Sequence, residues 1–338
     1  MNRIERALPI MAALLAWSCE ALPDAPARWN QTPIRGMTIV AWSRDGYDNA
    51  DLTMLREIRQ TGATHLSILT TAYQSSLHAE AVRADSARTP SSASLRRLLS
   101  DARAAGLETT LKPHIDLDDN AWRAFIDPTD PRAWFASYRS WILPLAALAD
   151  SAGCRQLVIG SELAGTIRHE EEWRDLIREI RTIYHGDLVY ASSWDEAFNV
   201  PFWDALDFVG VDYYFPVTTR SDPGRLDILA GWQPTLERLH MLERRAGRPV
   251  LLTEIGYRSI DGAGRAPWEY ATTGEIDLAE QADLYWGMLE ALSASGWISG
   301  LYVWNWSADG GGGEHDDDYT PRGKPALDEL TAAWSGGR

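Results

Sequence analysis

Residues 134–162, WFASYRSWILPLAALADSAGCRQLVIGSE, are the most informative part of the sequence for the fold. Residues 134–152 form a long, largely apolar segment of helical length, and Gly153 follows directly. A glycine there accepts the left-handed conformation that ends a helix, so the chain can turn at once into the apolar run 157–159. The stretch therefore predicts one helix and one buried strand, with Glu162 just beyond the strand.

The same order of helix, glycine and strand recurs along the chain. The predicted helices, each followed by a glycine and an apolar strand, are residues 51–60, 94–105, 134–152, 235–246 and 278–295. With three further apolar segments, the predicted strands are residues 37–41, 65–69, 109–111, 157–159, 188–191, 208–211, 250–252 and 301–303. Short apolar strands alternating with helices indicate a parallel sheet covered by helices. We expect an α/β fold, a single (β/α)8 TIM barrel, because no glycine-rich phosphate turn after the first strand favours a doubly wound sheet.

Polar and aromatic residues gather directly after these strands, where the active sites of (β/α)8 barrels lie. In chain order they are Trp42, Asp45, Lys112, His114, Ser161, Glu162, Trp194, Asp195, Tyr213, Tyr214, Glu254, Trp304 and Trp306. A purely structural protein does not need acids and aromatic residues at one rim of nearly every strand. This concentration predicts an enzyme.

Two glutamates dominate the rim, Glu162 after the fourth strand and Glu254 after the seventh. Desolvation disfavours a charge next to a buried strand, so each carboxylate needs a partner or a function. One interpretation is a salt bridge to a neighbouring Arg or Lys. The other is glycoside cleavage, in which one carboxyl group donates a proton and another attacks the sugar from about 5–5.5 Å away.

Three strings carry a family resemblance: residues 160–163, GSEL; residues 253–257, TEIGY; and residues 302–306, YVWNW. Together with residues 319–326, YTPRGKPA, they resemble glycoside hydrolase family 113, a family of β-1,4-mannanases in the clan of retaining (β/α)8 glycosidases. The resemblance implies that Glu162 is the acid/base and Glu254 the nucleophile. Most of that clan has Asn directly before the acid/base, where it binds the sugar 2-hydroxyl, whereas this chain has Ser161.

Other rim residues are candidates for binding the substrate. The resemblance places Trp304 as an aromatic floor under the reacting sugar, and aromatic faces pack well against pyranose C–H groups. Tyr213 or Tyr214 would donate a hydrogen bond that keeps Glu254 ionised. The predicted substrate-binding residues are Ser161, Tyr213, Tyr214, Trp304, Trp42, Lys112, His114, Trp194 and Asp195.

Composition limits the other partners. The net charge of −16 repels phosphate backbones, so we expect no nucleic-acid binding. The acidic run 314–318, EHDDD, has no calcium-loop spacing, and the chain lacks clustered His ligands, so we predict no metal and no cofactor. Cys154 is expected to be buried core filler.

The N-terminus resembles an export signal. Arg3 and Arg6 precede an apolar stretch too short to span a bilayer, and a small residue near Cys19 resembles a lipoprotein cleavage site. We expect residues 1–19 to be a signal peptide or lipoprotein signal, residues 20–34 a tether, and residues 35–336 the catalytic domain. The protein would then be secreted, periplasmic or anchored by a lipid at Cys19.

The leading hypothesis is an exported retaining glycoside hydrolase that cleaves β-linked polysaccharide or oligosaccharide, above all β-1,4-mannan, by double displacement. The alternative is a non-catalytic cell-surface polysaccharide-binding protein on the same barrel, suggested by Ser161. A metal-dependent barrel hydrolase is the third, and the missing His cluster disfavours it.

Overall fold

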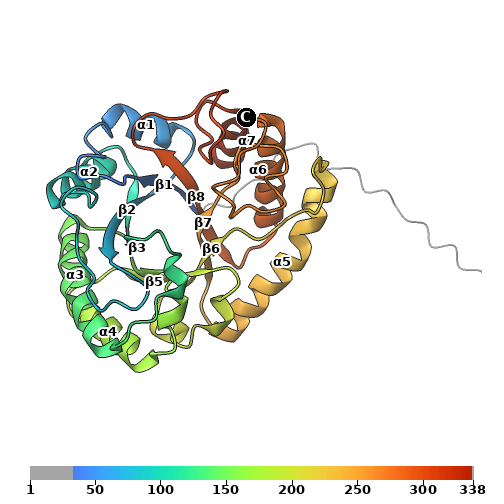
Figure 1. The fold of residues 1–338 in the computed structure, drawn as a ribbon. Coiled ribbons are helices and arrows are strands. Elements are labelled where there is room, and N and C mark those ends of the chain that lie inside the picture. The colour runs from blue at the N-terminus through green and yellow to red at the C-terminus, as the bar shows by residue number, and fades with distance from the viewer. Residues whose placement is uncertain (1–32, 337–338) are drawn as a thin grey trace, which may run out of the picture.

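The structure, a computed structural model, describes residues 33–336. Its strands are β1 (Ile34–Val40), β2 (His65–Gln74), β3 (Glu108–Leu117), β4 (Gln156–Ser161), β5 (Asp187–Ser193), β6 (Phe208–Tyr213), β7 (Val250–Ile255) and β8 (Ile298–Ser307). They pair in parallel in chain order and close into a barrel (Figure 1). The predicted (β/α)8 barrel is confirmed. The predicted signal, with Cys19, and nearly all of the tether lie outside the described residues.

The helices surround the barrel (Figure 1). They are α1 (Leu52–Gln60), α2 (Ser92–Ala104), α3 (Pro131–Ala152), α4 (Glu170–Arg181), α5 (Arg225–Ala246), α6 (Leu278–Ser293) and α7 (Pro325–Trp334). Between β5 and β6 the chain makes two short 3-10 turns, η3 (Ala197–Asn199) and η4 (Trp203–Ala205), in place of an α-helix. Within residues 33–336, no helix is both long enough and apolar enough to cross a membrane.

Helix α3 shows how local sequence sets these boundaries. The side chain of Asp130 accepts hydrogen bonds from the backbone N–H groups of Arg132 and Ala133, and Pro131 occupies the first helical position. The helix ends at Gly153, whose φ of 66° is left-handed and favours glycine. The chain then enters β4 three residues later, as the sequence predicts.

Part of the barrel interior is filled by a small cluster of buried side chains that includes Tyr302. Its hydroxyl group donates to the side-chain oxygen of Gln156 at 2.7 Å and lies 2.6 Å from the hydroxyl of Thr110. Gly36 of β1 faces this ring, and a Cβ atom there would lie 2.2 Å from it. Glycine is required at this position because the ring occupies the space of a side chain.

Irregular pairing marks the strands that carry the two glutamates. The register shifts between Val158 and Ser161 of β4, just before Glu162. A second shift, between Val211 and Asp212 of β6, pairs Asp212 with Glu254 of β7. Such irregularities re-aim side chains at barrel rims, so both carboxylates are set by local breaks in the ladder.

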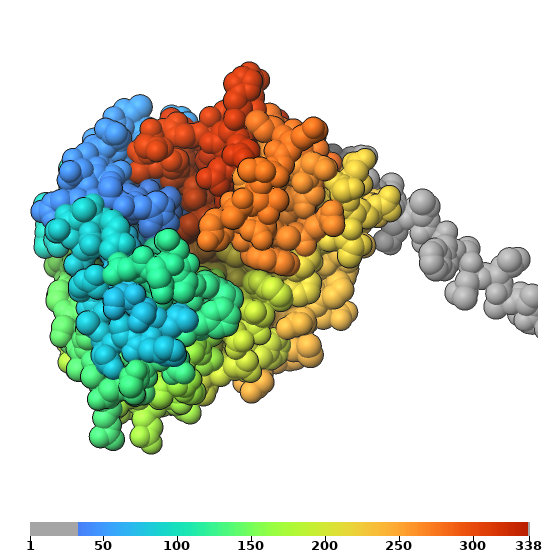
Figure 2. Space-filling model, in the orientation of Figure 1, coloured from blue at the N-terminus to red at the C-terminus, as the bar shows by residue number. Residues whose placement is uncertain are grey.

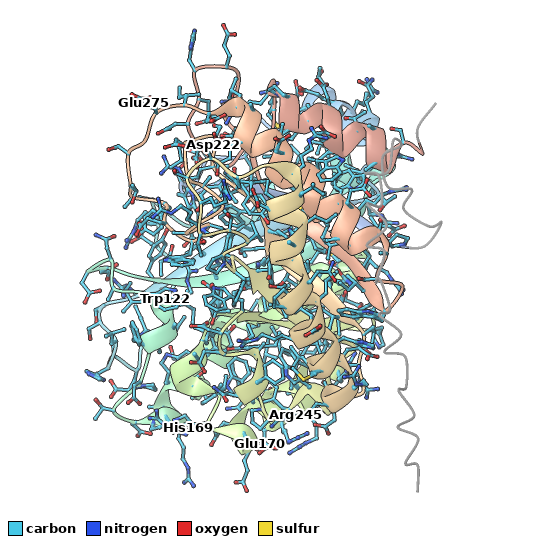
Figure 3. The ribbon with its side chains drawn as sticks, turned by 90° about the vertical axis from the view of Figure 1, so that its right-hand side faces the viewer. Trp122, His169, Glu170, Asp222, Arg245 and Glu275 are labelled. Carbon is cyan, nitrogen blue, oxygen red and sulfur yellow. The ribbon has the colours of Figure 1, made fainter. Side chains whose placement is uncertain are left out.

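The loops after the strands lie together at one end of the barrel. In the side view of Figure 3, Trp122, Asp222 and Glu275, which follow β3, β6 and β7, are all on the left side. This end is the carboxyl end of the strands, where (β/α)8 enzymes bind their substrates.

Candidate active site

A cleft of about 950 Å³ opens at the carboxyl end of the barrel. Figure 2 shows the molecule hollowed at the centre of this view, between segments from early and late in the chain. The residues lining the cleft are Trp42, Tyr73, Arg88, His114, Asp116, Leu117, Asn120, Ala121, Trp122, Arg123, Glu162, Ser193, Trp194, Asp195, Tyr214, Glu254, Trp268, Tyr270, Trp304, Asn305, Asp318 and Tyr319. Both predicted glutamates line it, and aromatic side chains surround them.

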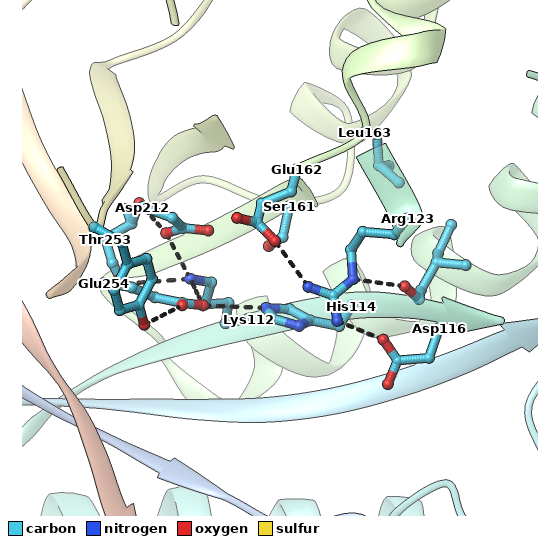
Figure 4. A network of polar contacts seen from close by, with 12 residues as sticks. Lys112, His114, Asp116, Arg123, Ser161, Glu162, Leu163, Asp212, Thr253 and Glu254 are labelled. Atoms are coloured by element: carbon cyan, nitrogen blue, oxygen red, sulfur yellow. Dashed lines mark hydrogen bonds and ion pairs between the residues drawn. The ribbon is translucent and has the colours of Figure 1, made fainter. Parts of the chain in front are cut away.

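Glu254, at the end of β7, is held from two sides (Figure 4). The ammonium group of Lys112 donates to Oε1 of Glu254 at 2.5 Å and to Oδ1 of Asp212 at 2.9 Å. The hydroxyl group of Tyr214 donates to Oε2 of Glu254 at 2.9 Å. Glu254 is 5% exposed and therefore lies at the bottom of the cleft with one cation and one neutral donor.

The charges under Glu254 are tightly balanced. Burial alone would lower the pKa of Lys112, but Asp212 and Glu254 raise it above its ordinary value, so the lysine stays charged. Burial, and then the charge of Glu254, raise the pKa of Asp212, although Lys112 and Thr253 both donate to its Oδ1 atom. Burial also raises the pKa of Tyr214 well above its usual range, which keeps its hydroxyl proton available for Glu254.

Glu162 follows β4 in a different environment. Its φ of 52° is left-handed, which is uncommon for a residue with a side chain and is found at functional sites. Its backbone N–H donates to the carbonyl group of Ala191 at 2.7 Å, and Nη1 of Arg123 donates to its Oε2 atom at 2.9 Å. Burial raises its pKa to about 7, and the charge of Arg123 opposes this rise.

The two carboxyl groups therefore lie in different environments, as a nucleophile and a proton donor require. Lys112 and Tyr214 both donate to Glu254, one to each of its carboxyl oxygens. Glu162 has a single charged partner, Arg123, and its pKa of about 7 allows it to hold or release a proton near neutrality. The salt bridges that the sequence left open do exist, yet both carboxyl groups also face the cleft.

His114 and Trp304 lie next to each other in the lining of the same cleft. Their rings are parallel within 5°, with centroids 6.3 Å apart, and both line the cleft. Nε2 of His114 lies 3.5 Å from Oε1 of Glu254, and neither ring nitrogen has a hydrogen-bond partner among the described residues. Burial and the charges of Arg123 and Lys112 lower the pKa of His114 well below its usual range, so the ring is neutral and able to bind a hydroxyl group.

Comparison with known proteins identifies the family. The profile of Glycoside Hydrolase Family 113 matches residues 37–324. This chain belongs to glycoside hydrolase family 113. The prediction of a retaining glycoside hydrolase of this family is confirmed. No curated protein matches the sequence significantly.

Solved structures of family 113 superpose closely. The β-mannanase AaManA from Alicyclobacillus acidocaldarius, in complex with ManMIm, has a TM-score of 0.82 at 26% identity, covering 90% of this chain and 98% of its own. A complex structure of a family 113 β-1,4-mannanase gives the same TM-score and identity and is covered over 99% of its length. A Bifidobacterium dentium β-glucuronidase, at 13% identity and a TM-score of 0.60, covers 90% of this chain but 46% of its own and shares the fold alone.

The structure brings most of the predicted rim of this family 113 chain together. Besides the two glutamates, the predicted residues that line the cleft are Trp42, His114, Trp194, Asp195, Tyr214 and Trp304. Asp45, a weaker candidate, is not among the residues that line it. Trp306 is fully buried, with the guanidinium of Arg322 over its ring, and belongs to the core.

Three predicted substrate-binding residues lie elsewhere. The ring of Tyr213 is buried and stacks on Trp232, because neighbouring residues at the end of a strand point to opposite sides and Tyr214 takes the inner one. Ser161 is also buried, and its hydroxyl group donates to the carbonyl of Pro113 at 3.4 Å rather than facing the cleft. Lys112 lies beneath the cleft surface, where it contacts carboxylates instead of sugar hydroxyls.

Several site residues were not predicted from the sequence. Asp212 follows the expected sixth strand and ends in the network under Glu254, but an acid beside two tyrosines gave no distinct signal. Arg123, Trp122, Trp268 and Tyr270 lie in the loops after β3 and β7. Loop residues have no periodicity, so the signals that the sequence offered for these residues were the length of the loops and their aromatic content.

Two further acidic clusters are held by contacts of their own, and one of them, the loop 314–318, reaches the cleft through Asp318. In the loop 314–318, Asp316 pairs with the buried Lys324 at 2.7 Å and Asp317 pairs with Arg258 at 2.9 Å, so the loop is fixed by salt bridges. Elsewhere, Asp261, Asp277 and Glu280 bring their oxygens within 4.8 Å of one another. Glu280 already accepts hydrogen bonds from the backbone N–H groups of Gly262 and Gly264, which explains its position without an ion.

Proposed function

We propose that this family 113 enzyme cleaves β-1,4-linked mannan or manno-oligosaccharides by double displacement, with Glu254 as nucleophile and Glu162 as acid/base. The observation that carries the proposal is the contrast between the two carboxyl groups in one cleft. Glu254 is hydrogen-bonded by Lys112 and Tyr214, whereas Glu162 has a pKa of about 7.

In the first step, a carboxylate oxygen of Glu254 attacks the anomeric carbon and the bond to the leaving sugar breaks. Glu162 gives its proton to the departing glycosidic oxygen, so the leaving sugar departs as an alcohol. Trp304 and His114 form the floor under the reacting sugar, and the neutral ring of His114 is free to bind one of its hydroxyl groups.

In the second step, Glu162 is ionised and takes a proton from water. The resulting hydroxide attacks the anomeric carbon from the side that the leaving sugar vacated, and the bond to Glu254 breaks. Lys112 and Tyr214 stabilise the carboxylate of Glu254 as it departs, because both donate to its oxygens. The same residue thus serves as acid and then as base, which favours a pKa near the working pH.

Similarity to structures of a family 113 β-1,4-mannanase and a family 113 β-mannanase, both at 26% identity, supports mannan as the substrate. The clefts of sugar-cleaving enzymes use aromatic faces, and Trp42, Trp122, Trp194 and Trp268 line this cleft around the two glutamates. A cleft with several aromatic faces can bind several sugar units at once, which suits a polymeric substrate.

The test is reducing-sugar release from mannan, xylan and β-glucan by the purified chain, with Glu254→Gln as the matched control. We expect release from mannan by the wild-type protein alone. Tight binding of mannan without release would instead support a non-catalytic polysaccharide-binding protein. Release from xylan or β-glucan but not from mannan would show that the substrate is a different polysaccharide.

We also propose export, supported by the sequence of residues 1–19 and by Cys19. Mass spectrometry of the mature protein from its native host would show cleavage near Cys19 and, for an anchored form, diacylglycerol on that cysteine. A mature chain that retains Met1 would contradict export through this signal.

A further inference from the structure

Arg123 is the link between Glu162 and the loop after β3, residues 118–130 (Figure 4). It lies in the 3-10 turn η1 (Arg123–Phe125), and its side chain is 17% exposed. Its guanidinium donates from Nη1 to Glu162 at 2.9 Å, from Nη2 to Asp116 at 2.5 Å and from Nε to the carbonyl of Ile115 at 2.9 Å. The planar guanidinium therefore directs donors to three acceptors at once.

The turn that carries Arg123 is itself packed against the turn after Glu162. A Cβ atom on Gly165, in the 3-10 turn η2 (Ala164–Thr166), would lie 2.2 Å from the carbonyl oxygen of Ile126, so only glycine allows this approach. On the outer side, Arg168 pairs with Asp127 and donates to the carbonyl of Gly165 at 3.1 Å. The packing of these two turns thus fixes the backbone at Arg123, from which its guanidinium contacts Glu162.

Resting on the proposed function, we propose that Arg123 is a positioning residue for Glu162: it holds the carboxyl group toward the leaving-group oxygen and balances its proton affinity so that Glu162 serves as acid and then as base. Burial raises the proton affinity of Glu162, and Arg123 is the nearest charge that opposes this rise.

The other groups that face Glu162 explain why Arg123 is needed. Asp212 of β6 and Glu254 of β7 favour the protonated form of Glu162, as burial does, while Lys112 of β3 favours the charged form. Lys112 is occupied by those same two carboxylates. Asp116 of β3 pairs with Arg123, and Tyr190 of β5, whose hydroxyl accepts from the backbone N–H of Leu163, is a further titratable group that interacts with Glu162.

Without Arg123, Glu162 would keep its proton to a higher pH. The first step would then persist at alkaline pH, because it needs the protonated acid. The second step would slow at neutral pH, because it needs the ionised base. A purely structural role for Arg123 predicts lower activity with an unchanged pH dependence.

The experiment compares the wild-type protein with Arg123→Gln, Arg123→Lys and, as a matched control, Arg168→Gln. Arg168 bridges the same two loops but does not contact Glu162. The pH profile of kcat/KM is measured on manno-oligosaccharide, and kcat is measured at pH 7 on an activated dinitrophenyl manno-oligoside with and without azide. Thermal unfolding verifies that each variant is folded.

We expect the alkaline limb of Arg123→Gln to move upward by about one to three pH units, the effect of losing an adjacent opposite charge. Its kcat on the activated substrate should fall at pH 7, and azide should restore turnover because azide needs no general base. Arg123→Lys retains the charge and should keep its alkaline limb near that of the wild type, as should Arg168→Gln.

An active Arg123→Gln variant with the wild-type alkaline limb would overturn the proposal. If that variant does not fold, Arg123→Lys decides, because a limb displaced from the wild type despite the retained charge would also overturn it. Absence of turnover by the wild-type protein on every manno-oligosaccharide would overturn the proposed function instead, so the two failures are distinguishable.

Discussion

Replacing Lys112 with methionine tests the charge balance under Glu254. Lys112 is fully buried and is the shared donor of two carboxylates, at 2.9 Å to Asp212 and 2.5 Å to Glu254. Methionine fills a similar volume without the charge. The change leaves two buried carboxyl groups without their cation, and breaking a buried pair from one side costs about 3–5 kcal/mol of the free energy of unfolding.

The pH dependence of this loss has a definite sign. Burial and the charge of Glu254 already raise the folded-state pKa of Asp212, and without Lys112 it would rise further above the unfolded value of about 4. Stability from such groups is fully present below the unfolded pKa and is lost as the pH rises through the folded pKa. The deficit of Lys112→Met should therefore be small near pH 4 and reach about 3–5 kcal/mol at pH 7.

Urea unfolding of both proteins between pH 4 and pH 8 measures this deficit. The double variant Lys112→Met with Asp212→Asn removes the like charge that remains and should recover most of the lost stability at pH 7. A deficit under about 1 kcal/mol at pH 7, or one that does not change between pH 4 and pH 7, would show that Lys112 does not neutralise these carboxylates.

Three further predictions concern the cleft. Glu162→Gln should lose nearly all turnover of mannan, while azide should restore turnover of an activated aryl glycoside; full activity of this variant on the polymer would contradict its role as acid. Tyr214→Phe removes the 2.9 Å hydrogen bond to Glu254 and should lower kcat/KM roughly 10- to 100-fold, equivalent to about 1.5–3 kcal/mol, with wild-type kinetics as the opposing result. Trp122→Ala should raise KM for mannan by roughly fivefold, ~1 kcal/mol of stacking, without changing hydrolysis of a short aryl mannoside, and equal effects on both substrates would count against a stacking role.

The fold could be predicted from the sequence because each unit marks its own ends. A glycine after each of five predicted helices, with a short apolar run after the glycine, identified five strands, and three further apolar segments identified the other three. The boundaries were less predictable. Residues 109–111 were predicted for the third strand, but β3 continues to Leu117. The prediction was too short because polar residues such as Lys112 and His114 interrupt the apolar run.

Helix α4 shows a second limit. Its sequence, EEEWRDLIREIR, is dominated by charge, and the apolar face of Trp173, Leu176, Ile177 and Ile180 is narrow. That spacing is nevertheless helical, and this signal was available in the sequence. Between β5 and β6 a (β/α)8 barrel normally has a helix, but this chain has two 3-10 turns there.

The site was predictable where chemistry follows a strand directly. Glu162 and Glu254 both come immediately after apolar runs, and the structure places both in the cleft. The choice between Tyr213 and Tyr214 needed the register of β6, since neighbouring residues at its end point to opposite sides. Arg123 was not predictable, because it meets Glu162 across 39 residues of sequence through a loop that has no periodic pattern.

Trapping the sugar on the enzyme tests directly whether Glu254 is the nucleophile. A manno-oligosyl fluoride with fluorine at C2 reacts readily in the first step and slowly in the second, so a covalent intermediate accumulates. We expect one sugar per chain, attached to Glu254 and located by peptide mass spectrometry, with no labelling of Glu254→Gln. An active enzyme that carries the label on another residue, or that releases the product with inverted configuration, would contradict this expectation.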